Sequence, residues 1–174
     1  VKSNKFIKVF TGAEIKEVSG FVGNFKSKIS VPEKGIVDIE HGVIIIATGA
    51  LEYNPTEYSY GQNKNIITQR ELEESIVKNK SAFAGHQELN VVMVQCVGSR
   101  NDEHPYCSRV CCSEAVKNAL LLKEINPNIN IYILYRDIRT YGMKELYYQK
   151  ALSAGVVFIR YDENNKPDIQ QTED

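Results

Sequence analysis

All four cysteines of this 174-residue chain lie within one stretch, from residue 96 to residue 112. They are Cys96, Cys107, Cys111 and Cys112, in the pattern C-x10-C-x3-C-C. Thiols gathered so closely are typical of a metal site or a redox centre. These four residues are therefore the candidate site of the chain.

Several interpretations of the four cysteines are open. Reduced, buried cysteines pack as small hydrophobic residues. Zinc sites with four cysteine ligands usually use two C-x2-C pairs, and a redox disulfide usually uses C-x-x-C; neither spacing occurs here. An iron–sulfur cluster also takes cysteine thiolates as ligands. The pattern favours the cluster, and zinc is the main alternative.

The cysteines lie where an α/β protein binds its ligands. The apolar run Val91 to Gln95 predicts a buried strand, and a broad apolar face predicts a helix from near Ser108 to Ile125. Ligands bind at the carboxyl ends of parallel strands, in the loop before the next helix. On a helix Cys107 and Cys111 would share a face, with Cys96 closing the set from the strand end.

The loop after this strand does not have the sequence of a dinucleotide site. It contains a single glycine, Gly98, instead of G-x-G-x-x-G, which disfavours a nucleotide in the usual pose. The helix N-terminus, Arg100 and Arg109 would offset the charge of thiolates. His104 is interpreted either as a residue that caps the site or as an exposed loop side chain.

The second half of the chain alternates between strand and helix patterns. Residues 131–135 and 156–161 predict two further strands, and residues 144–154 predict a helix that ends at Gly155. This alternation predicts a Rossmann-like α/β unit with a parallel sheet. After the strand at 131–135 come four residues suited to an anion, to an acidic partner surface or to a solvated loop: Arg136, Asp137, Arg139 and Tyr141.

The first half has a different pattern. Residues 6–10, 14–18 and 24–31 predict the strands of a small antiparallel β meander. The continuous apolar run Val43 to Ala47 predicts a strand buried on both faces of a parallel sheet, ending at the tight exit Thr48-Gly49-Ala50. Thr68 and Glu71 form a capping box for a helix that runs to about Lys78.

Composition excludes several classes of function. The chain has 43% hydrophobic and 25% charged residues, as ordinary globular proteins do. With 21 basic and 22 acidic residues, it offers no electrostatic case for nucleic acid or an anionic membrane. Its apolar runs fall far short of the roughly 20 residues that span a bilayer.

Six motifs resemble one known family, the A-subunit of heterodisulfide reductase and its homologues. They extend over nearly the whole chain, and the cysteine motif among them is specific. The motifs are IIATGA (45–50), ITQ (67–69), VQCVGSR (94–100), HPYCSRVCC (104–112), LYRDIRTYG (134–142) and GVVFIRY (155–161).

The resemblance implies a cytoplasmic iron–sulfur flavoprotein with a thioredoxin-reductase-like core, which relays electrons towards the other subunits of a complex. By the resemblance, the four cysteines would ligate a four-iron four-sulfur cluster, and Thr48 and Gly49 would approach FAD. The family's G-x-G-x-x-G flavin fingerprint and its ferredoxin-type cysteine runs are absent. We therefore expect an oxidoreductase fragment that is inactive by itself; the alternative is a zinc-binding interaction module without redox activity.

The patterns and the resemblance together predict three regions. Residues 1–55 would be the C-terminal portion of an FAD-binding domain, 56–90 a linker with one helix, and 91–174 an α/β unit like an NAD domain that carries the cysteines. The chain opens without methionine and abruptly at a strand-like segment, so we expect a piece of a larger protein. No signal peptide is visible.

Overall fold

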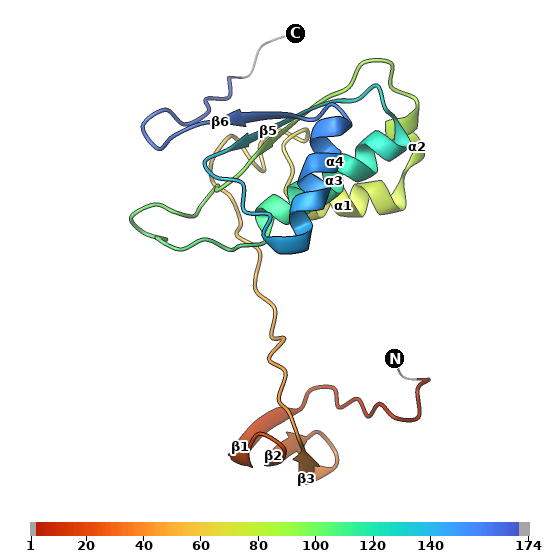
Figure 1. Ribbon diagram of the computed structural model, residues 1–174, viewed down its shortest axis with the longest axis vertical. Coiled ribbons are helices and arrows are strands. Elements are labelled where there is room, and N and C mark those ends of the chain that lie inside the picture. Colours follow the sequence, from red (N-terminus) through yellow and green to blue (C-terminus); the bar gives the residue numbers. More distant parts are fainter. Residues whose placement is uncertain (1–2, 171–174) are drawn as a thin grey trace. The chain divides into compact units, whose positions relative to one another are not determined.

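The computed structural model describes residues 3–170, so both the predicted first region and the predicted last region include terminal residues outside the described range. The chain divides into two compact units after Leu51 (Figure 1). Each unit is described by itself below. Within residues 3–170, no helix is both long enough and apolar enough to cross a bilayer.

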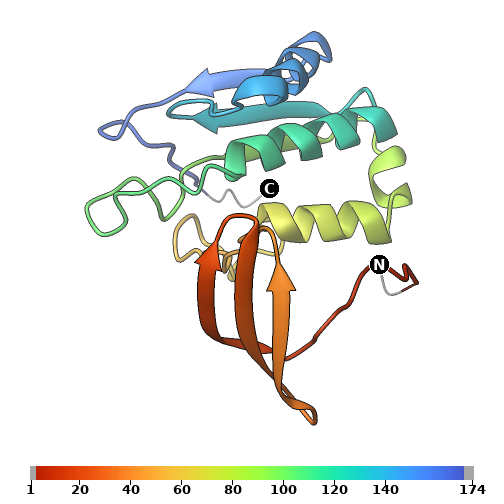
Figure 2. The ribbon, with the colours of Figure 1, turned by 60° about the horizontal axis from the view of Figure 1, so that its bottom comes forward.

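The first unit is an antiparallel meander of three strands (Figure 2). Strand β1 spans Glu14–Phe21, β2 spans Asn24–Val31 and β3 spans Gly35–His41. The central strand β2 pairs with both neighbours. Its side chains alternate as the sequence predicts, with Ile29 and Val31 buried and the lysines exposed. The predicted meander is confirmed, and two of its strands, β1 and β2, cover the predicted residues 14–18 and 24–31.

Residues 6–10, predicted as the first strand, form no strand, and that prediction is wrong. Phe6 is 85% exposed, and the segment pairs with no strand among the described residues. The third strand of the meander is instead β3, which was not predicted from the sequence. In β3, Val37 and Ile39 alternate with charged residues, a pattern of period two that an edge strand requires.

The apolar run Val43 to Ala47 is also not a strand, contrary to the prediction. It is extended but unpaired, and Ile45 and Ile46 are 85% and 83% exposed. A strand buried on both faces needs neighbouring strands and a covering layer. Among the described residues nothing supplies them to this run.

The second unit is the predicted α/β unit. Strands β4 (Asn90–Val94), β5 (Asn130–Tyr135) and β6 (Val157–Arg160) form a parallel sheet in the order β4-β5-β6. The predicted Rossmann-like class is confirmed, with strand boundaries shifted by one residue. The helical segments are α1 (Gln69–Lys78), α2 (Ser81–Ala84), α3 (Cys111–Ile125), the 3-10 turn η1 (Gly142–Lys144) and α4 (Glu145–Ser153).

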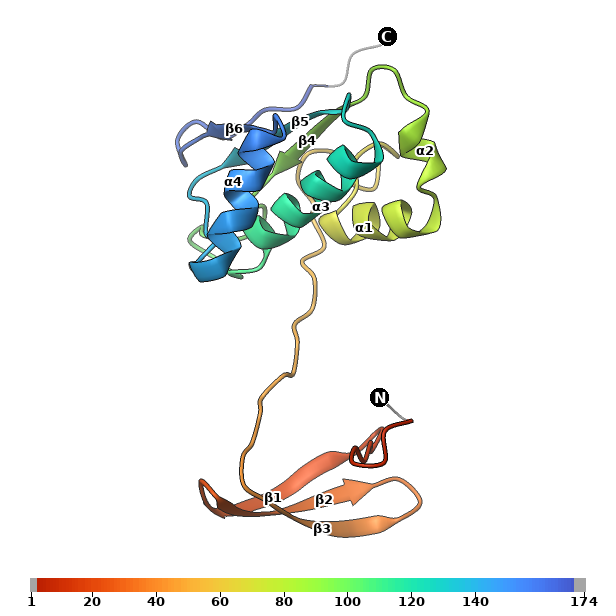
Figure 3. The ribbon, with the colours of Figure 1, turned by 45° about the vertical axis from the view of Figure 1, so that its right-hand side comes forward.

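Helices α1, α3 and α4 lie together on one side of this sheet (Figure 3). Met93, Ile131 and Ile133 project from the sheet into a buried core shared with the helices. The members that the helices supply are Leu72 and Ile76 of α1, Ala115, Val116, Ala119 and Leu122 of α3, and Ala151 of α4. The core thus fixes α3, and with it the first turn that carries two of the cysteines.

Helix α1 is part of this unit. Its predicted capping box is confirmed, because Thr68 Oγ1 accepts from the Glu71 N–H at 3.2 Å and Glu71 Oε2 accepts from the Thr68 N–H at 2.7 Å. Buried Asn118 of α3 donates from Nδ2 to the Gln69 carbonyl at 3.1 Å. Residues 56–90, expected to be a linker, therefore contribute a packed helix to the second unit.

Candidate metal centre

The cysteines lie at the edge of the sheet where the three parallel strands end. Cys96 lies two residues past the end of β4, and the N–H of Gln95, between them, donates to the Leu134 carbonyl of β5 at 2.9 Å. Tyr161, just past β6, donates its hydroxyl to the Gln95 carbonyl. Since residues at the ends of β5 and β6 both bond the end of β4, the position of Cys96 is well fixed.

The loop between β4 and α3 has an unusual backbone. Cys96, Arg100 and Arg109 all adopt left-handed φ angles, of 64°, 59° and 59°. For residues other than glycine this conformation costs on the order of 1 kcal/mol or more each, and such strain clusters at functional sites. The loop is therefore held in shape by its contacts rather than by local preference.

The left-handed residue at 109 also corrects a prediction. A right-handed helix cannot pass through φ of 59°, so α3 begins at Cys111 and not near Ser108. Cys107 lies before the helix and does not share a helical face with Cys111. Nothing in the local residue types indicates this break, because arginine favours helices.

Three of the four thiols lie together. The pKa of Cys111 is lowered to about 6, chiefly by the Cys112 thiol and further by the Ser108 hydroxyl and the Cys96 backbone, while burial opposes the shift. Cys112, only 3% exposed, also approaches the Asp137 carbonyl, with its Sγ at 3.6 Å. The first turn of α3 and the end of β4 thus join Cys96, Cys111 and Cys112.

The other two thiols of this group have raised pKa values. The hydrogen bond to Cys111, then burial, raises the pKa of Cys112. Burial raises the pKa of Cys96 most, and the Arg100 guanidinium, with Nη1 at 3.9 Å from the sulfur, partly offsets this rise. Metal binding would change this arrangement, because a metal needs its cysteine ligands deprotonated, including Cys112 beside Cys111.

Cys107 stands slightly apart on the loop. Its Sγ accepts from the Arg109 N–H at 3.3 Å, and a thiolate there is near enough to raise the pKa of Cys96. In residues 3–170 no three His, Cys, Asp or Glu side chains already have the geometry of a metal site. The donor set nevertheless fits one, because four thiols border a single loop.

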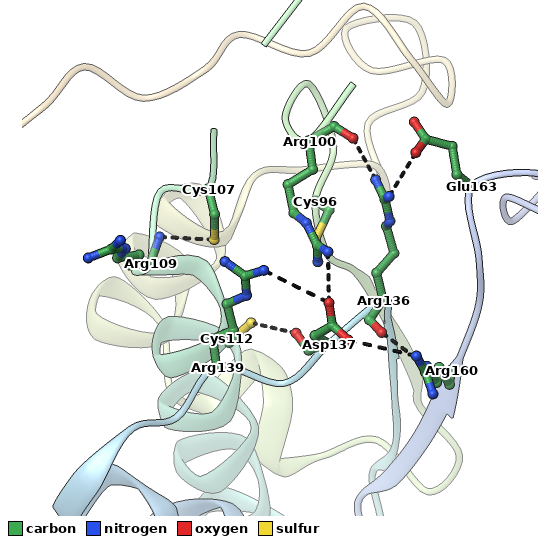
Figure 4. Close-up of polar contacts among 10 residues, drawn as sticks. All are labelled: Cys96, Arg100, Cys107, Arg109, Cys112, Arg136, Asp137, Arg139, Arg160 and Glu163. Atoms are coloured by element: carbon green, nitrogen blue, oxygen red, sulfur yellow. Dashed lines mark hydrogen bonds and ion pairs between the residues drawn. The ribbon is translucent and has the colours of Figure 1, made fainter. Parts of the chain in front are cut away.

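Asp137 gathers arginines beside the thiols (Figure 4). Its carboxylate pairs with Arg100 at 2.7 Å, Arg160 at 3.8 Å and Arg139 at 3.9 Å. The hydrogen bond from Arg100 is the main reason that the pKa of Asp137 is lowered. Of the residues that the sequence offered as an anion site, Asp137 and Arg139 are engaged in this network.

Arg136 braces the loop from a second direction. Its Nη1 donates to the Arg100 carbonyl at 2.7 Å, and its Nη2 pairs with Glu163 at 2.8 Å. This network pairs more arginines than carboxylates: Arg100, Arg136, Arg139 and Arg160 with Asp137 and Glu163. The loop itself also carries Arg109, Asp102 and Glu103.

Aromatic contacts on the loop were missed by sequence reasoning. The ring of Tyr53 lies against Gly98, where a Cβ would overlap it, and Gly98 has a left-handed φ of 63°. His104 packs edge-on against Tyr53 and Tyr106, with ring centroids 6.3 and 5.7 Å away. His104 thus takes part in an aromatic contact. The only feature of the sequence that pointed to a close contact at this loop was its single glycine, Gly98.

Thr48 and Gly49 belong to the first unit, in the extended segment that follows β3. Gly49 has a left-handed φ of 68°, and a Cβ there would meet nothing within 4 Å. An approach of these residues to FAD stays a prediction.

No protein-family model matches the chain. Curated relatives do. The A-subunit of H(2):CoB-CoM heterodisulfide,ferredoxin reductase from Methanothermobacter marburgensis is 40% identical over 138 residues. The A-subunit of H(2)/formate:CoB-CoM heterodisulfide,ferredoxin reductase from Methanococcus maripaludis is 42% identical over 139 residues. The iron-sulfur A-subunit of CoB--CoM heterodisulfide reductase from Methanocaldococcus jannaschii is 41% identical over 140 residues.

Each of these matches covers 71% of this chain and 21% of the relative. The chain therefore spans about a fifth of the length of the curated relatives. Their names describe reductases, subunits of a larger complex and, in one case, an iron–sulfur protein. The resemblance seen in the motifs is confirmed, and the chain is homologous to a part of the A-subunit of heterodisulfide reductase.

Proposed function

We propose that the second unit holds a four-iron four-sulfur cluster on Cys96, Cys107, Cys111 and Cys112, as part of an electron-transferring oxidoreductase subunit. When bound, such a cluster accepts and donates single electrons. The role of this chain is to hold the four thiolates at the carboxyl end of β4. The convergence of Cys96, Cys111 and Cys112 is the observation that carries the proposal.

The electrostatics of the loop support an anionic group there. Four thiolates around an iron–sulfur core carry a net negative charge, which grows on reduction. The arginine excess offsets it, and Arg100 in particular lies next to Cys96 and is only partly exposed. The first turn of α3 adds its helix dipole at Cys111.

The aromatic cover of the loop supports the same function. Tyr53 packs on Gly98, and His104 packs between Tyr53 and Tyr106. Apolar and aromatic surroundings control solvent access to a metal centre and tune its potential. Tyr53 is thus positioned to shield the loop that carries the thiols.

The proposal extends to the longer protein. The electron exchange would involve FAD, with Thr48 and Gly49 near the flavin, in a cytoplasmic complex with other subunits. Residues 1–55 would complete an FAD-binding domain, in which Val43 to Ala47 becomes a paired strand. The exposure of Ile45 and Ile46 supports this, since so apolar a run is suited to burial.

Anaerobic reconstitution with iron and sulfide tests the proposal. We expect a brown protein with the broad visible absorbance of iron–sulfide charge transfer and about four iron atoms per chain, the content of such a cluster. Cys111→Ser should lose most of this absorbance, because it removes a ligand. Ser99→Ala, a change in the same loop that removes no thiol, is the matched control and should load normally.

The zinc alternative gives a different result in the same experiment. A colourless protein that retains one zinc after exposure to both metals would overturn the cluster and favour the interaction module. A chain that takes up neither metal, and whose thiols all react freely with a thiol reagent, would overturn both.

A further inference from the structure

Buried polar atoms without a hydrogen-bond partner concentrate beside the cysteines. Within residues 3–170 there are four such side-chain atoms, and three of them are Gln95 Nε2, Gln95 Oε1 and Ser113 Oγ. Gln95 directly precedes Cys96, and Ser113 directly follows Cys112. The fourth, Asn118 Oδ1, belongs to a side chain that already bonds α1 through its other atom. Gln95 is thus the one side chain of this set whose entire amide is unpaired.

The position of Gln95 makes this unusual. The residue is 2% exposed, so its amide has given up its hydration without receiving a protein partner. Buried polar groups in proteins are nearly always paired, and an exception calls for a missing ligand, ion or water. An apolar side chain would fill the same space at a lower free energy.

The direction of the side chain follows from the strand. Side chains alternate along β4, so Gln95 projects to the same face of the sheet as Met93, which lies in the core with α3. Gln95 stands nearer the carboxyl end of the sheet, where α3 begins with Cys111 and Cys112. Its backbone is fixed by Leu134 and Tyr161, so the side chain cannot swing to the solvent face.

We propose that the Gln95 amide donates a hydrogen bond from Nε2 to a sulfur of the group that the four thiolates hold. This inference rests on the proposed function and adds a positioning residue to it. The amide is unpaired in the metal-free chain because its acceptor arrives with the ligand. Such a hydrogen bond favours the more negative, reduced form and so raises the reduction potential.

Gln95→Met tests this with two effects of opposite sign. Methionine keeps the length and apolar volume of the side chain but removes the amide. In the metal-free chain the variant should unfold at a higher urea concentration than the wild type, since an unpaired buried group is gone. In the reconstituted chain it should show a more negative midpoint potential and a faster loss of iron to a chelator.

The readouts are urea unfolding followed by circular dichroism, a redox titration followed by electron paramagnetic resonance, and the rate of iron release. Gln95→Asn keeps the donor but withdraws it by one methylene, and it should shift the potential in the same direction by a smaller amount. Ser99→Ala should leave all three measurements at the wild-type values.

Several outcomes overturn the inference. Wild-type potential and iron retention in Gln95→Met would show that the amide does not serve the bound group, while the cluster itself stands. A metal-free Gln95→Met chain that is less stable than the wild type, or unfolded, would show that the amide already has a partner. A wild-type chain that assembles no cluster would overturn the proposed function and this inference together.

Discussion

Two apolar runs of similar composition, Val43 to Ala47 and Asn90 to Val94, adopt different structures. The second is strand β4, paired with β5 and covered by α3, with Met93 in the core. The first is extended, unpaired and largely exposed. A run of β-branched residues can therefore form a strand, but neighbouring segments decide whether the strand forms.

The largest contrast between the two runs should appear in amide hydrogen exchange. We expect the amides of residues 91–94 to be protected at least on the order of a thousandfold more than those of residues 44–47, because exchange in a core strand requires extensive unfolding. Mass spectrometry of peptides from the two runs measures the ratio. Comparable protection of both runs would show that the first is covered after all.

Truncation of one side chain in each run should give the next largest effect. Met93→Ala removes a core side chain and should lower the free energy of unfolding by about 2–5 kcal/mol. Ile45→Ala removes an 85% exposed side chain and should change it by less than about 0.5 kcal/mol. Denaturant unfolding of the two variants provides the comparison, and equal losses would contradict it.

The chemistry at the end of the paired strand offers a finer contrast. In the metal-free chain, Cys111 should react with iodoacetamide at a rate that rises with pH to a plateau, half-maximal near pH 6, because hydrogen bonds lower the pKa of Cys111 to about 6. Cys96 should reach its half-maximal rate at a higher pH than an ordinary thiol, because burial raises its pKa.

Mass spectrometry of alkylated peptides, sampled from about pH 5 to about pH 10, separates these two thiols. Ser108→Ala removes one hydrogen bond to the Cys111 sulfur and should move its midpoint to higher pH. Identical profiles for Cys96 and Cys111 would show that the strand end does not fix their surroundings.

The smallest effect concerns Asp137, which braces the loop after β4. Its pKa is lowered in the folded chain, chiefly by Arg100, so its ion pairs contribute stability that is present above the unfolded pKa of about 3.9 and lost as pH falls below it. Asp137→Asn should therefore cost up to about 1 kcal/mol near pH 7, because the carboxylate is partly exposed, and progressively less as the pH falls through the lowered pKa of Asp137.

Unfolding experiments on the wild type and Asp137→Asn across this pH range give the difference directly. A difference that persists at the acid end would mean that the asparagine disturbs packing rather than charge. The corresponding change in the first unit, Glu40→Gln in the exposed pair with Lys26, should have less effect at any pH.

Features set by neighbouring residues were predictable from the sequence. The capping box of Thr68 and Glu71 and the alternation of β2 depend on side chains a few positions apart, and both are confirmed. The parallel sheet followed from the strand and helix periods. The α3 start was missed because the left-handed φ at Arg109 depends on loop contacts that the sequence does not display.

Contacts between distant segments were not predictable. Arg100 and Asp137 are 37 positions apart, and Tyr161 reaches Gln95 across 66. The thiols could be named as candidates because cysteine is chemically distinctive and clustered. Gln95 could not be named as a candidate, because an isolated glutamine is typical of a protein surface. Its burial depends on contacts that form only in the fold.

Of the four cysteines only Cys112 is buried, and the hydrophobic cluster that joins the sheet of the second unit to its helices contains none of them. Unlike a zinc finger, whose chain folds around its ion, this unit has a core that can form before any group binds at the cysteines. For the proposed cluster, insertion would then be a step separate from folding.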